Sequence, residues 1–461
     1  MFDLLVIGSG PGGYTAAIRA AQLGFRTAIV ERAEWGGICL NWGCIPTKAL
    51  LRSAQVLQET RQAAGFGIHA ENIAPDIAAI VARSRAVAAG MNKGVEFLLK
   101  KNNIALFAGT ATLLADKSVE ITGSAGGRQT VTAPHVIIAT GARARSLPFA
   151  PIDGKKIIGY REALTPAEIP ESLAVIGSGA IGCELAYFYR CMGAEVTLIE
   201  YMDAIAPLED ADISAQLSRA FRKAGIKVIT SAQVTHADTS GEGCTLRLQT
   251  KKGEETVTAS KILSAAGITA NIENMGLEAA GAAVEHGRIK VDERYRTGAA
   301  GIYAVGDVIA TPALAHVAAA EALACVEYIA GRSPEPVDYD NIPSCLYTTP
   351  ETASVGLTER AAREQGYALR TGKYFYAASG KAAADGDRDG LVKLLFDDAS
   401  GKLLGAHLAG SHVTEMIAEL VLARQTGARA GDLLRAIHPH PSMSEGIFEA
   451  ARMSDELRVK S

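Results

Sequence analysis

The sequence predicts an α/β protein, because a motif of strand, glycine turn, helix and strand occurs twice in it and an α+β module follows. The first copy lies at the beginning of the chain, and the second begins at Leu173. From about Tyr339 onward, short alternating strands and one long helix replace this pattern. With 461 residues, the chain is long enough for about three domains.

The first glycine motif consists of a strand, a turn, a helix and a second strand at residues 2–7, 8–13, 14–23 and 27–30. In such a motif Gly8 permits the tight turn, Gly10 lets the backbone approach a pyrophosphate, and Gly13 lets helix and strand pack closely. The pyrophosphate would lie at the helix N-terminus, and Glu31 would accept hydrogen bonds from a ribose. The motif therefore predicts a dinucleotide site.

The second glycine motif repeats this order at residues 173–176, 177–182, 183–192 and 196–199. Its first two glycines are Gly177 and Gly179, and Glu200 follows its second strand. The first glycine and the acid are 23 residues apart in both copies, since 31 − 8 equals 200 − 177. An acid at Glu200, followed by Tyr201 and Met202 rather than arginines, disfavours a 2′-phosphate. We therefore expect NAD rather than NADP at this second site.

Cys39 and Cys44 lie between the two motifs, after Gly36 and Gly37 and just before a helical pattern. Pro46 favours a helix start, which would place Cys44 at the positive end of that helix, where the pKa of a thiol is lowered. Two unremarkable buried thiols are the alternative. The glycines and the nucleotide motif upstream favour a working redox pair. A dithiol and two nucleotide sites predict an electron relay, with a flavin between the sulfurs and a nicotinamide.

The remaining patterns predict the rest of the architecture. Domains are expected at 1–145 and 268–338 for the first nucleotide, at 146–267 for the second, and at 339–461 for the C-terminal module. Helices are expected at 76–105, 212–224 and 414–426, with a further one opening at 313–316. Strands are expected at 119–121, 130–132, 135–139, 227–229, 245–248, 255–257, 302–307, 372–377, 391–396 and 403–409.

Two further positions carry side chains suited to chemistry. Asp307 ends a predicted strand and is placed to bind a hydroxyl such as those of the flavin ribityl chain; a helix cap is the alternative. His440 precedes Pro441, which fixes the backbone, and Glu445 is near enough in sequence to orient the imidazole and raise its basicity. A thiol base needs this arrangement, although a histidine and a glutamate at such spacing also occur as structural pairs.

The bulk composition excludes several classes of protein. A net charge of −4 provides neither a basic face for nucleic acid nor a polybasic membrane anchor. The apolar stretch 313–330 is interrupted by His316, Glu321 and Glu327, so it is not expected to span a membrane. Seven cysteines without a regular framework, and a chain that opens on a strand, predict a reducing cytoplasm. No metal site is expected.

Together these motifs resemble the pyridine nucleotide–disulfide oxidoreductases, nearly end to end. The matching segments are 8–13, 36–51, 139–141, 177–184, 303–307, 314–316, 347–356 and 440–445. The resemblance implies FAD and NAD as cofactors and an obligate homodimer, with 339–461 as the interface domain. It is closest to family members that oxidise protein-bound dihydrolipoamide to lipoamide and reduce NAD⁺ to NADH. Their partners are the lipoyl domains and acyltransferase core of 2-oxoacid dehydrogenase complexes, or the lipoyl protein of glycine cleavage.

Carried over by residue, the resemblance implies that Cys44 contacts the flavin and that Cys39 exchanges with the substrate. Lys48 and Glu184 would form an ion pair beside the flavin, and His440, oriented by Glu445, would act on the dithiol of the other subunit. The implied FAD residues are Gly8, Gly10, Gly13, Glu31, Lys48, Ala111, Thr140, Gly141, Asp307 and Ala315. The implied NAD residues are Gly177, Gly179, Ala180, Ile181, Glu200, Val234 and Gly267.

The chain departs from the family pattern at two places, and two alternative functions are also considered. Many relatives carry Arg-x-Pro-Asn after the glycine at 267, where this chain has Ile-Thr-Ala-Asn, and Ser442 replaces the more usual threonine. Within the class, the chain could reduce another disulfide, such as glutathione, or mercuric ion. Glu200 argues against the first, and the absence of cysteines after Cys345 argues against the second. From a different class, it could be a flavin-loaded scaffold subunit, which the Cys-His-Glu set disfavours.

Overall fold

The computed structural model describes residues 2–460, and these fold into two compact units that are each discontinuous in sequence. Unit 1 contains residues 2–50, 78–145 and 267–337. Unit 2 contains residues 51–77, 146–266 and 338–460. The bounds of the four domain segments given by the sequence remain a prediction.

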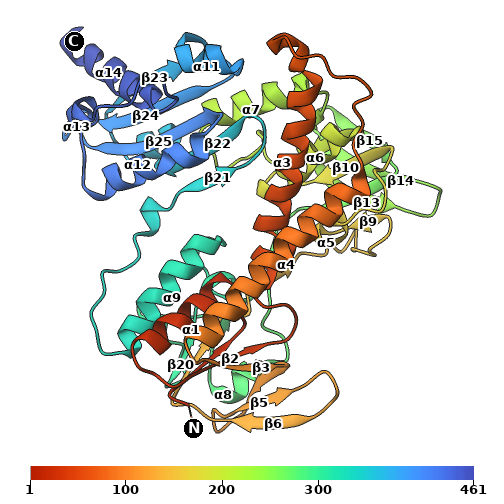
Figure 1. Ribbon diagram of the computed structural model, residues 1–461, viewed down its shortest axis with the longest axis vertical. Coiled ribbons are helices and arrows are strands. Elements are labelled where there is room, and N and C mark those ends of the chain that lie inside the picture. Colours follow the sequence, from red (N-terminus) through yellow and green to blue (C-terminus); the bar gives the residue numbers. More distant parts are fainter. Residues whose placement is uncertain (1, 461) are drawn as a thin grey trace. The chain divides into compact units, whose positions relative to one another are not determined.

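Unit 1 is built on a parallel five-stranded sheet with the strand order β20-β7-β1-β2-β3. Every residue of β1 is buried, because its neighbours β2 and β7 pair with it on both sides and helices cover the sheet. Helices α1 and α9 lie side by side (Figure 1). The elements are β1 (Leu4–Ile7), α1 (Pro11–Gln22), β2 (Thr27–Glu31), β3 (Ala105–Ala108), β7 (His135–Ile138), β20 (Ile302–Ala304) and α9 (Ala315–Ile329).

Smaller elements complete unit 1, among them an antiparallel sheet of order β4-β5-β6 and the antiparallel pairs β8-β17 and β18-β19. They are β4 (Thr110–Leu113), β5 (Val119–Thr122), β6 (Arg128–Val131), β8 (Ala142–Ala144), β17 (Ile268–Ala270), α8 (Leu277–Ala280), β18 (Val284–Glu285) and β19 (Arg288–Ile289). Three more helices lie wholly or partly in this unit: α2 (Gly37–Trp42), α3 (Cys44–Arg61) and α4 (Ile77–Lys101). The helix predicted at 76–105 is therefore too long, because Asn103 takes a left-handed φ of 55° and the chain turns into β3.

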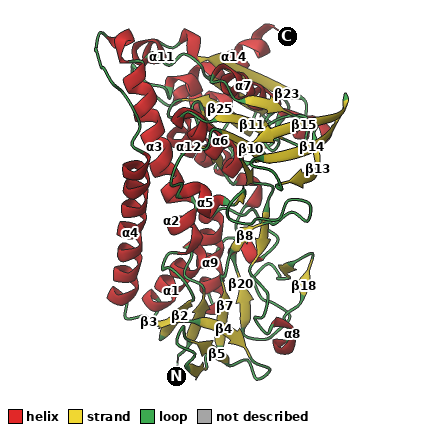
Figure 2. Cartoon of the chain, turned by 90° about the vertical axis from the view of Figure 1, so that its right-hand side faces the viewer, coloured by secondary structure: helices red, strands yellow, loops and turns green. Residues whose placement is uncertain are grey.

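Unit 2 contains a second parallel five-stranded sheet, with the order β12-β11-β10-β16-β9. An antiparallel sheet, β13-β14-β15, packs on it through a shared apolar core, and Figure 2 shows these strands beside β10 and β11. The elements are β9 (Ile157–Ile158), α5 (Tyr160–Leu164), β10 (Ser172–Ile176), α6 (Ala180–Met192), β11 (Glu195–Ile199), α7 (Ala211–Lys223), β12 (Lys227–Ile229), β13 (Gln233–Asp238), β14 (Cys244–Thr250), β15 (Gly253–Ala259) and β16 (Lys261–Ser264).

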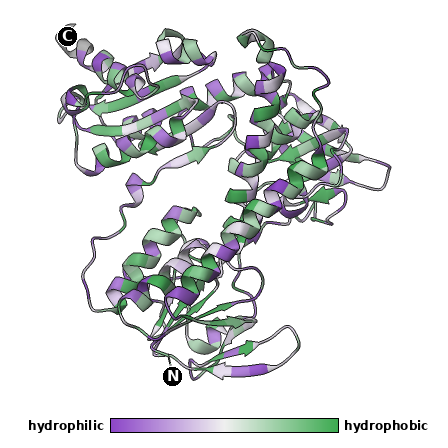
Figure 3. Ribbon diagram, in the orientation of Figure 1, coloured by the Kyte–Doolittle hydropathy of each residue, from purple (hydrophilic) through white to green (hydrophobic). Residues whose placement is uncertain are grey.

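The C-terminal part of unit 2 is an antiparallel sheet of order β21-β22-β25-β24-β23. Strands β24 and β25 are mostly hydrophobic in Figure 3, and their residues are buried on both faces of the sheet. Val392, Leu394 and Phe396 of β24 share a core with α12 and α14, whereas Leu391 packs against Ile213 of α7. The elements are β21 (Ser344–Leu346), β22 (Glu351–Gly356), α10 (Glu359–Glu364), β23 (Leu369–Phe375), α11 (Gly380–Asp385), β24 (Leu391–Asp397), β25 (Leu403–Gly410), α12 (Val413–Gln425), α13 (Ala430–Arg435) and α14 (Glu445–Lys460).

The predicted α/β class, with two nucleotide-binding sheets and a C-terminal α+β module, is confirmed. Short 3₁₀ helices lie at Ala63–Phe66, Gly306–Val308, Tyr339–Asn341 and Tyr376–Ala378. Across residues 2–460, none of the helices is both long enough and apolar enough to cross a bilayer.

Candidate active site

In the first glycine turn, two glycines are required by close packing and a third faces open space. Gly8 has a left-handed φ of 97°, and a Cβ there would lie 2.4 Å from the carbonyl oxygen of Ala139. A Cβ on Gly13 would lie 1.9 Å from the carbonyl oxygen of Gly8, so α1 can pack this closely only without a side chain. Gly10 is different: its φ is −65°, and a Cβ there would meet no atom within 4 Å. The fold does not require glycine at this position, but a ligand at the N-terminus of α1 would.

The second glycine turn, at the N-terminus of α6, has the same combination of crowded and open glycines. Gly177 has the same φ of 97°, and a Cβ on Gly182 would lie 1.9 Å from the carbonyl oxygen of Gly177. Gly179, at φ −69°, again faces open space. Ala180 begins the helix, and the next side chain, Ile181, is 37% exposed.

The acid that ends each motif is held by the serine inside its glycine turn. One carboxylate oxygen of Glu31 accepts hydrogen bonds from the amide and the hydroxyl of Ser9, at 2.9 and 2.7 Å. Glu200 accepts the same pair from Ser178, at 2.9 and 2.6 Å. The second oxygen of each acid accepts an amide two residues onward, from Ala33 or Met202. Sequence reasoning missed both serines, although the repeated Gly-Ser-Gly was their signal.

These turns fit the two dinucleotides that the sequence predicts. Each combines an open glycine, the positive end of a helix of 12 or 13 residues and a fixed carboxylate. Backbone N–H groups at a helix N-terminus bind phosphates, and the carboxylate is the group that binds a ribose. The chain can therefore hold FAD on α1 and NAD on α6.

The cysteine stretch packs directly on the first glycine turn. A Cβ on Gly37, the first residue of α2, would lie 2.7 Å from the Cα of Gly10. The amide of Gly36 donates a hydrogen bond to the Ser9 hydroxyl at 3.1 Å, so one serine holds both Glu31 and the start of α2. These contacts hold the start of α2, and with it the dithiol segment, against the first glycine turn.

The two sulfurs lie at the junction between α2 and α3. Cys39 belongs to α2 and Cys44 is the first residue of α3, with their Sγ atoms 2.6 Å apart. A disulfide bond is about 2.05 Å long, so a small side-chain movement joins them. The contact with Cys44, followed by burial, raises the pKa of the Cys39 thiol, while Lys48 opposes that shift. Two separate thiolates side by side are therefore disfavoured.

The other predicted FAD residues of unit 1 lie on several of its elements. Thr140 donates its hydroxyl to the carbonyl oxygen of Asn271 at 2.7 Å, and Gly141 has a φ of 67°. Burial raises the pKa of Asp307, and the guanidinium of Arg288, which also donates to its carbonyl oxygen, opposes this. Ala111 is buried in β4, and Ala315 begins α9. Asn271, which sequence reasoning noted only as part of a departure, also donates its side-chain amide to the carbonyl oxygen of Thr140 at 2.9 Å.

The remaining predicted residues are divided between the units. In unit 2, Val234 is buried in β13, and Glu184, buried in α6, accepts a hydrogen bond from the amide of Tyr347 at 3.1 Å. Gly267 and Lys48 belong to unit 1. The ion pair between Lys48 and Glu184 stays a prediction.

His440 and Glu445 lie together, as their spacing predicts. His440 Nδ1 is 2.8 Å from Oε1 of Glu445, and Oε2 accepts the amide of Ser442, also at 2.8 Å. The amide of Ser442 is the main reason that the pKa of Glu445 lies below its usual range; burial opposes this shift, and the His440 ring adds to it. The His440 side chain is 80% exposed, so its Nε2 edge is open to a substrate or to another subunit.

The arrangement of two glycine turns, a dithiol and a histidine–carboxylate pair defines a nucleotide-linked disulfide oxidoreductase. Residues 2–322 match the family model "Pyridine nucleotide-disulphide oxidoreductase", and residues 342–451 match its dimerisation domain. The chain belongs to this family. Among the residues that the structure describes, no group of three or more His, Cys, Asp or Glu side chains is arranged to hold a metal ion.

Individual members of this family are similar to the chain over nearly its whole length. The chain is 48% identical to a dihydrolipoyl dehydrogenase of Rhizobium etli, covering 97% of both chains. It is also 48% identical to one of Chlorobaculum tepidum, covering 98% of this chain and 96% of the relative. The crystal structure of LpdA from Mycobacterium tuberculosis superposes with a TM-score of 0.91 at 28% identity, covering 98% of this chain and 99% of that one.

Gly179→Ala is expected to leave the fold intact and to weaken NADH binding about tenfold or more, because the methyl group occupies the space that a phosphate would approach. Its backbone φ of −69° suits alanine. Gly182→Ala is the matched control, since its Cβ would collide with Gly177 and should destabilise the fold itself. Thermal melting and titration of NADH by nucleotide fluorescence measure the two effects. Unchanged NADH affinity in folded Gly179→Ala would show that no dinucleotide binds this turn.

Proposed function

We propose that this chain is an NAD-dependent dihydrolipoyl dehydrogenase, which oxidises protein-bound dihydrolipoamide to lipoamide and reduces NAD⁺ to NADH. The observation that carries the proposal is the packing of the Cys39–Cys44 segment on one glycine turn while a second, complete glycine turn lies elsewhere in the chain. Dithiol chemistry and a nicotinamide thus have separate sites. The family and the activity named for relatives at 40–48% identity agree with it.

The cofactors are FAD and NAD, as in the family. FAD, when bound, supplies the two-electron chemistry that links a dithiol to a nicotinamide. We assign it to Gly8, Gly10, Gly13, Glu31, Lys48, Ala111, Thr140, Gly141, Asp307 and Ala315. We assign NAD to Gly177, Gly179, Ala180, Ile181, Glu200, Val234 and Gly267.

In the thiol half-reaction, His440 accepts a proton from one thiol of dihydrolipoamide, and Glu445 stabilises the imidazolium. The resulting thiolate attacks Cys39 Sγ of the oxidised pair, the Cys39–Cys44 bond breaks, and Cys44 leaves as a thiolate. The second substrate thiol then displaces Cys39 and gives its proton to the departing Cys39 sulfur, which closes the ring of lipoamide and leaves both cysteines reduced. We infer from the family resemblance that Lys48 and Glu184 form an ion pair beside this centre.

The assembly follows from the C-terminal module, which matches the family's dimerisation domain and so supports a homodimer. The exposed ring of His440 suits a base that serves the dithiol of the second subunit. We assign the partners to the lipoyl domains and acyltransferase core of 2-oxoacid dehydrogenase complexes, or to the glycine cleavage lipoyl protein. We place the enzyme in the cytoplasm, where the five cysteines other than Cys39 and Cys44 would stay reduced.

The purified protein is expected to be yellow and to reduce lipoamide with NADH. NADH should be preferred to NADPH by about a hundredfold or more, because Glu200 repels a 2′-phosphate. Absorbance of bound flavin and the NADH-dependent rates with lipoamide and glutathione disulfide test this. A colourless folded protein, or one that reduces only glutathione disulfide, would refute the proposal. Bound flavin without turnover of either disulfide would indicate the scaffold alternative.

A further inference from the structure

Lys393 is a buried lysine on the face of the C-terminal sheet that packs against α7. It is residue three of β24, and its side chain is 2% exposed. Its register partner on β25 is His407, and its partner on β23 is Lys373. Because side chains alternate along a strand, Lys393 lies on the same face as Leu391, which contacts Ile213 of α7. Sequence reasoning missed this residue.

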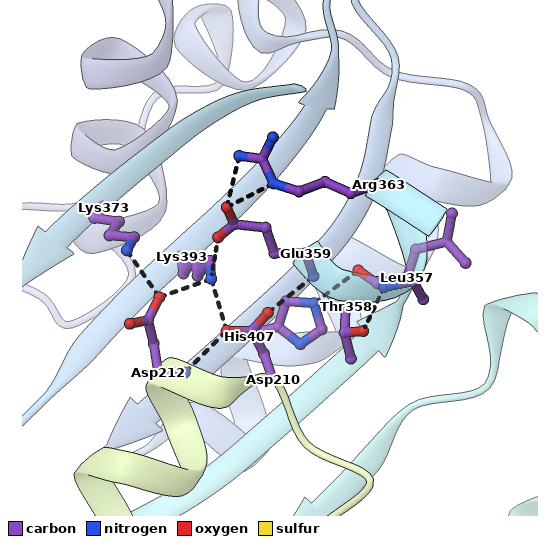
Figure 4. Close-up of polar contacts among 10 residues, drawn as sticks. Asp210, Asp212, Leu357, Thr358, Glu359, Arg363, Lys373, Lys393 and His407 are labelled. Carbon is purple, nitrogen blue, oxygen red and sulfur yellow. Dashed lines mark hydrogen bonds and ion pairs between the residues drawn. The ribbon is translucent and has the colours of Figure 1, made fainter. Parts of the chain in front are cut away.

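Three carboxylates satisfy the three protons of the Lys393 ammonium group. The oxygens of Asp210, Asp212 and Glu359 each lie 2.7 Å from Nζ (Figure 4). Two further cations balance the charge: Lys373 contacts Asp212 at 2.8 Å, and Arg363 contacts Glu359 at 2.8 Å. A buried charge is tolerated only when it is paired and hydrogen-bonded in this way.

Asp210 connects this cluster to the first turn of α7. It is the N-cap residue, and its Oδ1 accepts the amide of Asp212 at 3.1 Å as well as the Lys393 proton. Its Oδ2 accepts the amide of Glu359 at 2.9 Å. Burial is the largest influence on Asp210 and opposes its ionisation, but these hydrogen bonds outweigh it and lower the pKa of Asp210. The carboxylate therefore remains charged where α7 begins.

A short chain of hydrogen bonds runs from that turn to the second glycine motif. The Ser214 hydroxyl, in the first turn of α7, donates to the carbonyl oxygen of Ala206 at 3.1 Å. The amide of Ala206 donates to the carbonyl oxygen of Ser178 at 3.1 Å and approaches its hydroxyl at 3.2 Å. Ser178 in turn holds Glu200. One end of the loop 201–210 is thus attached to Glu200, and its other end is attached to Lys393 through Asp210.

We propose that Lys393 is a positioning residue for the nicotinamide nucleotide, acting from the C-terminal sheet through Asp210 and the loop 201–210 on Ser178 and Glu200. The inference rests on the proposed NAD site of α6. It predicts that loss of the ammonium group relaxes the loop and misplaces the ribose acid, while the thiol half-reaction keeps its geometry.

Lys393→Met is expected to raise the KM for NADH about 3- to 30-fold, as for residues that couple to a site through intervening contacts. The KM for lipoamide should stay within about twofold of the parent, because the variant leaves the dithiol segment untouched. Both constants are measured on the flavin-loaded protein, with an artificial electron acceptor for NADH. The matched control is Lys223→Met, at the other end of α7, whose ion pair with Asp389 is exposed. Both of its constants should stay within about twofold.

Asp210→Asn keeps the test decisive if Lys393→Met fails to fold, because an amide oxygen still caps α7 while the charge is lost. In this variant too, the KM for NADH should rise while the KM for lipoamide stays within about twofold of the parent. An unchanged KM for NADH in the folded variants, or an equal rise in both KM values, would overturn the role of Lys393. A parent protein that binds NADH but does not reduce lipoamide would instead contradict the proposed activity, and direct NADH titration would still test Lys393.

Discussion

Replacing Cys44 with serine should abolish lipoamide turnover, by a factor on the order of 10⁴ or more, as for loss of a catalytic nucleophile. A hydroxyl cannot form the bond with Cys39 that stores two electrons, although the Sγ atoms lie only 2.6 Å apart in the parent. Flavin binding should persist, because Gly10 and its contact with Gly37 are unchanged. Electron transfer from NADH to an artificial acceptor should therefore continue. The two rates and the flavin absorbance are measured on the same preparation.

Cys244→Ser is the matched control for the loss of a thiol. Cys244 is buried in β14, and its Sγ faces the carbonyl oxygens of Ser260 and Lys156 at 3.7 and 3.9 Å, which a serine hydroxyl can also approach. Both rates should match those of the parent. Retained lipoamide turnover in Cys44→Ser would show that these sulfurs are not the redox pair.

Replacing His440 with glutamine should slow the thiol half-reaction about 10²- to 10⁴-fold, the usual contribution of a general base. Glutamine has a similar size but cannot accept the substrate proton. Reduction of an artificial acceptor by NADH should remain near the parent rate. Stopped-flow reduction by dihydrolipoamide and the NADH assay separate the two half-reactions. His236→Gln, an exposed change on β13, is the control. An equal loss in both assays would contradict a role in thiol chemistry.

The same pair determines how activity responds to acid. The folded-state pKa of Glu445 is lowered, chiefly by the Ser442 amide, so its interaction with His440 is present above that pKa and is lost as the pH falls through it. Glu445 therefore stays ionised to a lower pH than an ordinary glutamate, whose pKa is about 4.3. In the parent, the loss of activity between pH 7 and about 5 should not come from Glu445. Glu445→Gln should lower the rate across the profile.

The sequence predicts both glycine motifs because their requirements are local. A left-handed φ at Gly8 and at Gly177, and a helix packed within contact distance of the turn, require glycine whatever surrounds them. The strands beside them are continuous apolar runs, as buried parallel strands are. The Cys39–Cys44 pair and the His440–Glu445 pair were predictable for the same reason, since each lies within six residues of sequence.

Features that depend on distant parts of the chain were not predictable. Lys393 appears in the sequence as an ordinary polar position within a strand, and its partner Asp210 is 183 residues away. The packing of Gly37 on Gly10 likewise requires the folded turn. The helix predicted at 76–105 continued too far because Asn103 carries no proline or glycine signal, and its left-handed conformation is visible only in the structure.

Ser9 and Ser178 orient their acids through the same pair of hydrogen bonds, in two motifs to which we assign different cofactors. A contact that is identical in both places cannot distinguish the cofactors. We therefore propose that it serves what they have in common, the adenosine diphosphate half of each molecule. The choice between an isoalloxazine and a pyridine ring then falls to whatever surrounds the other half, and on α1 that neighbourhood begins with the dithiol segment.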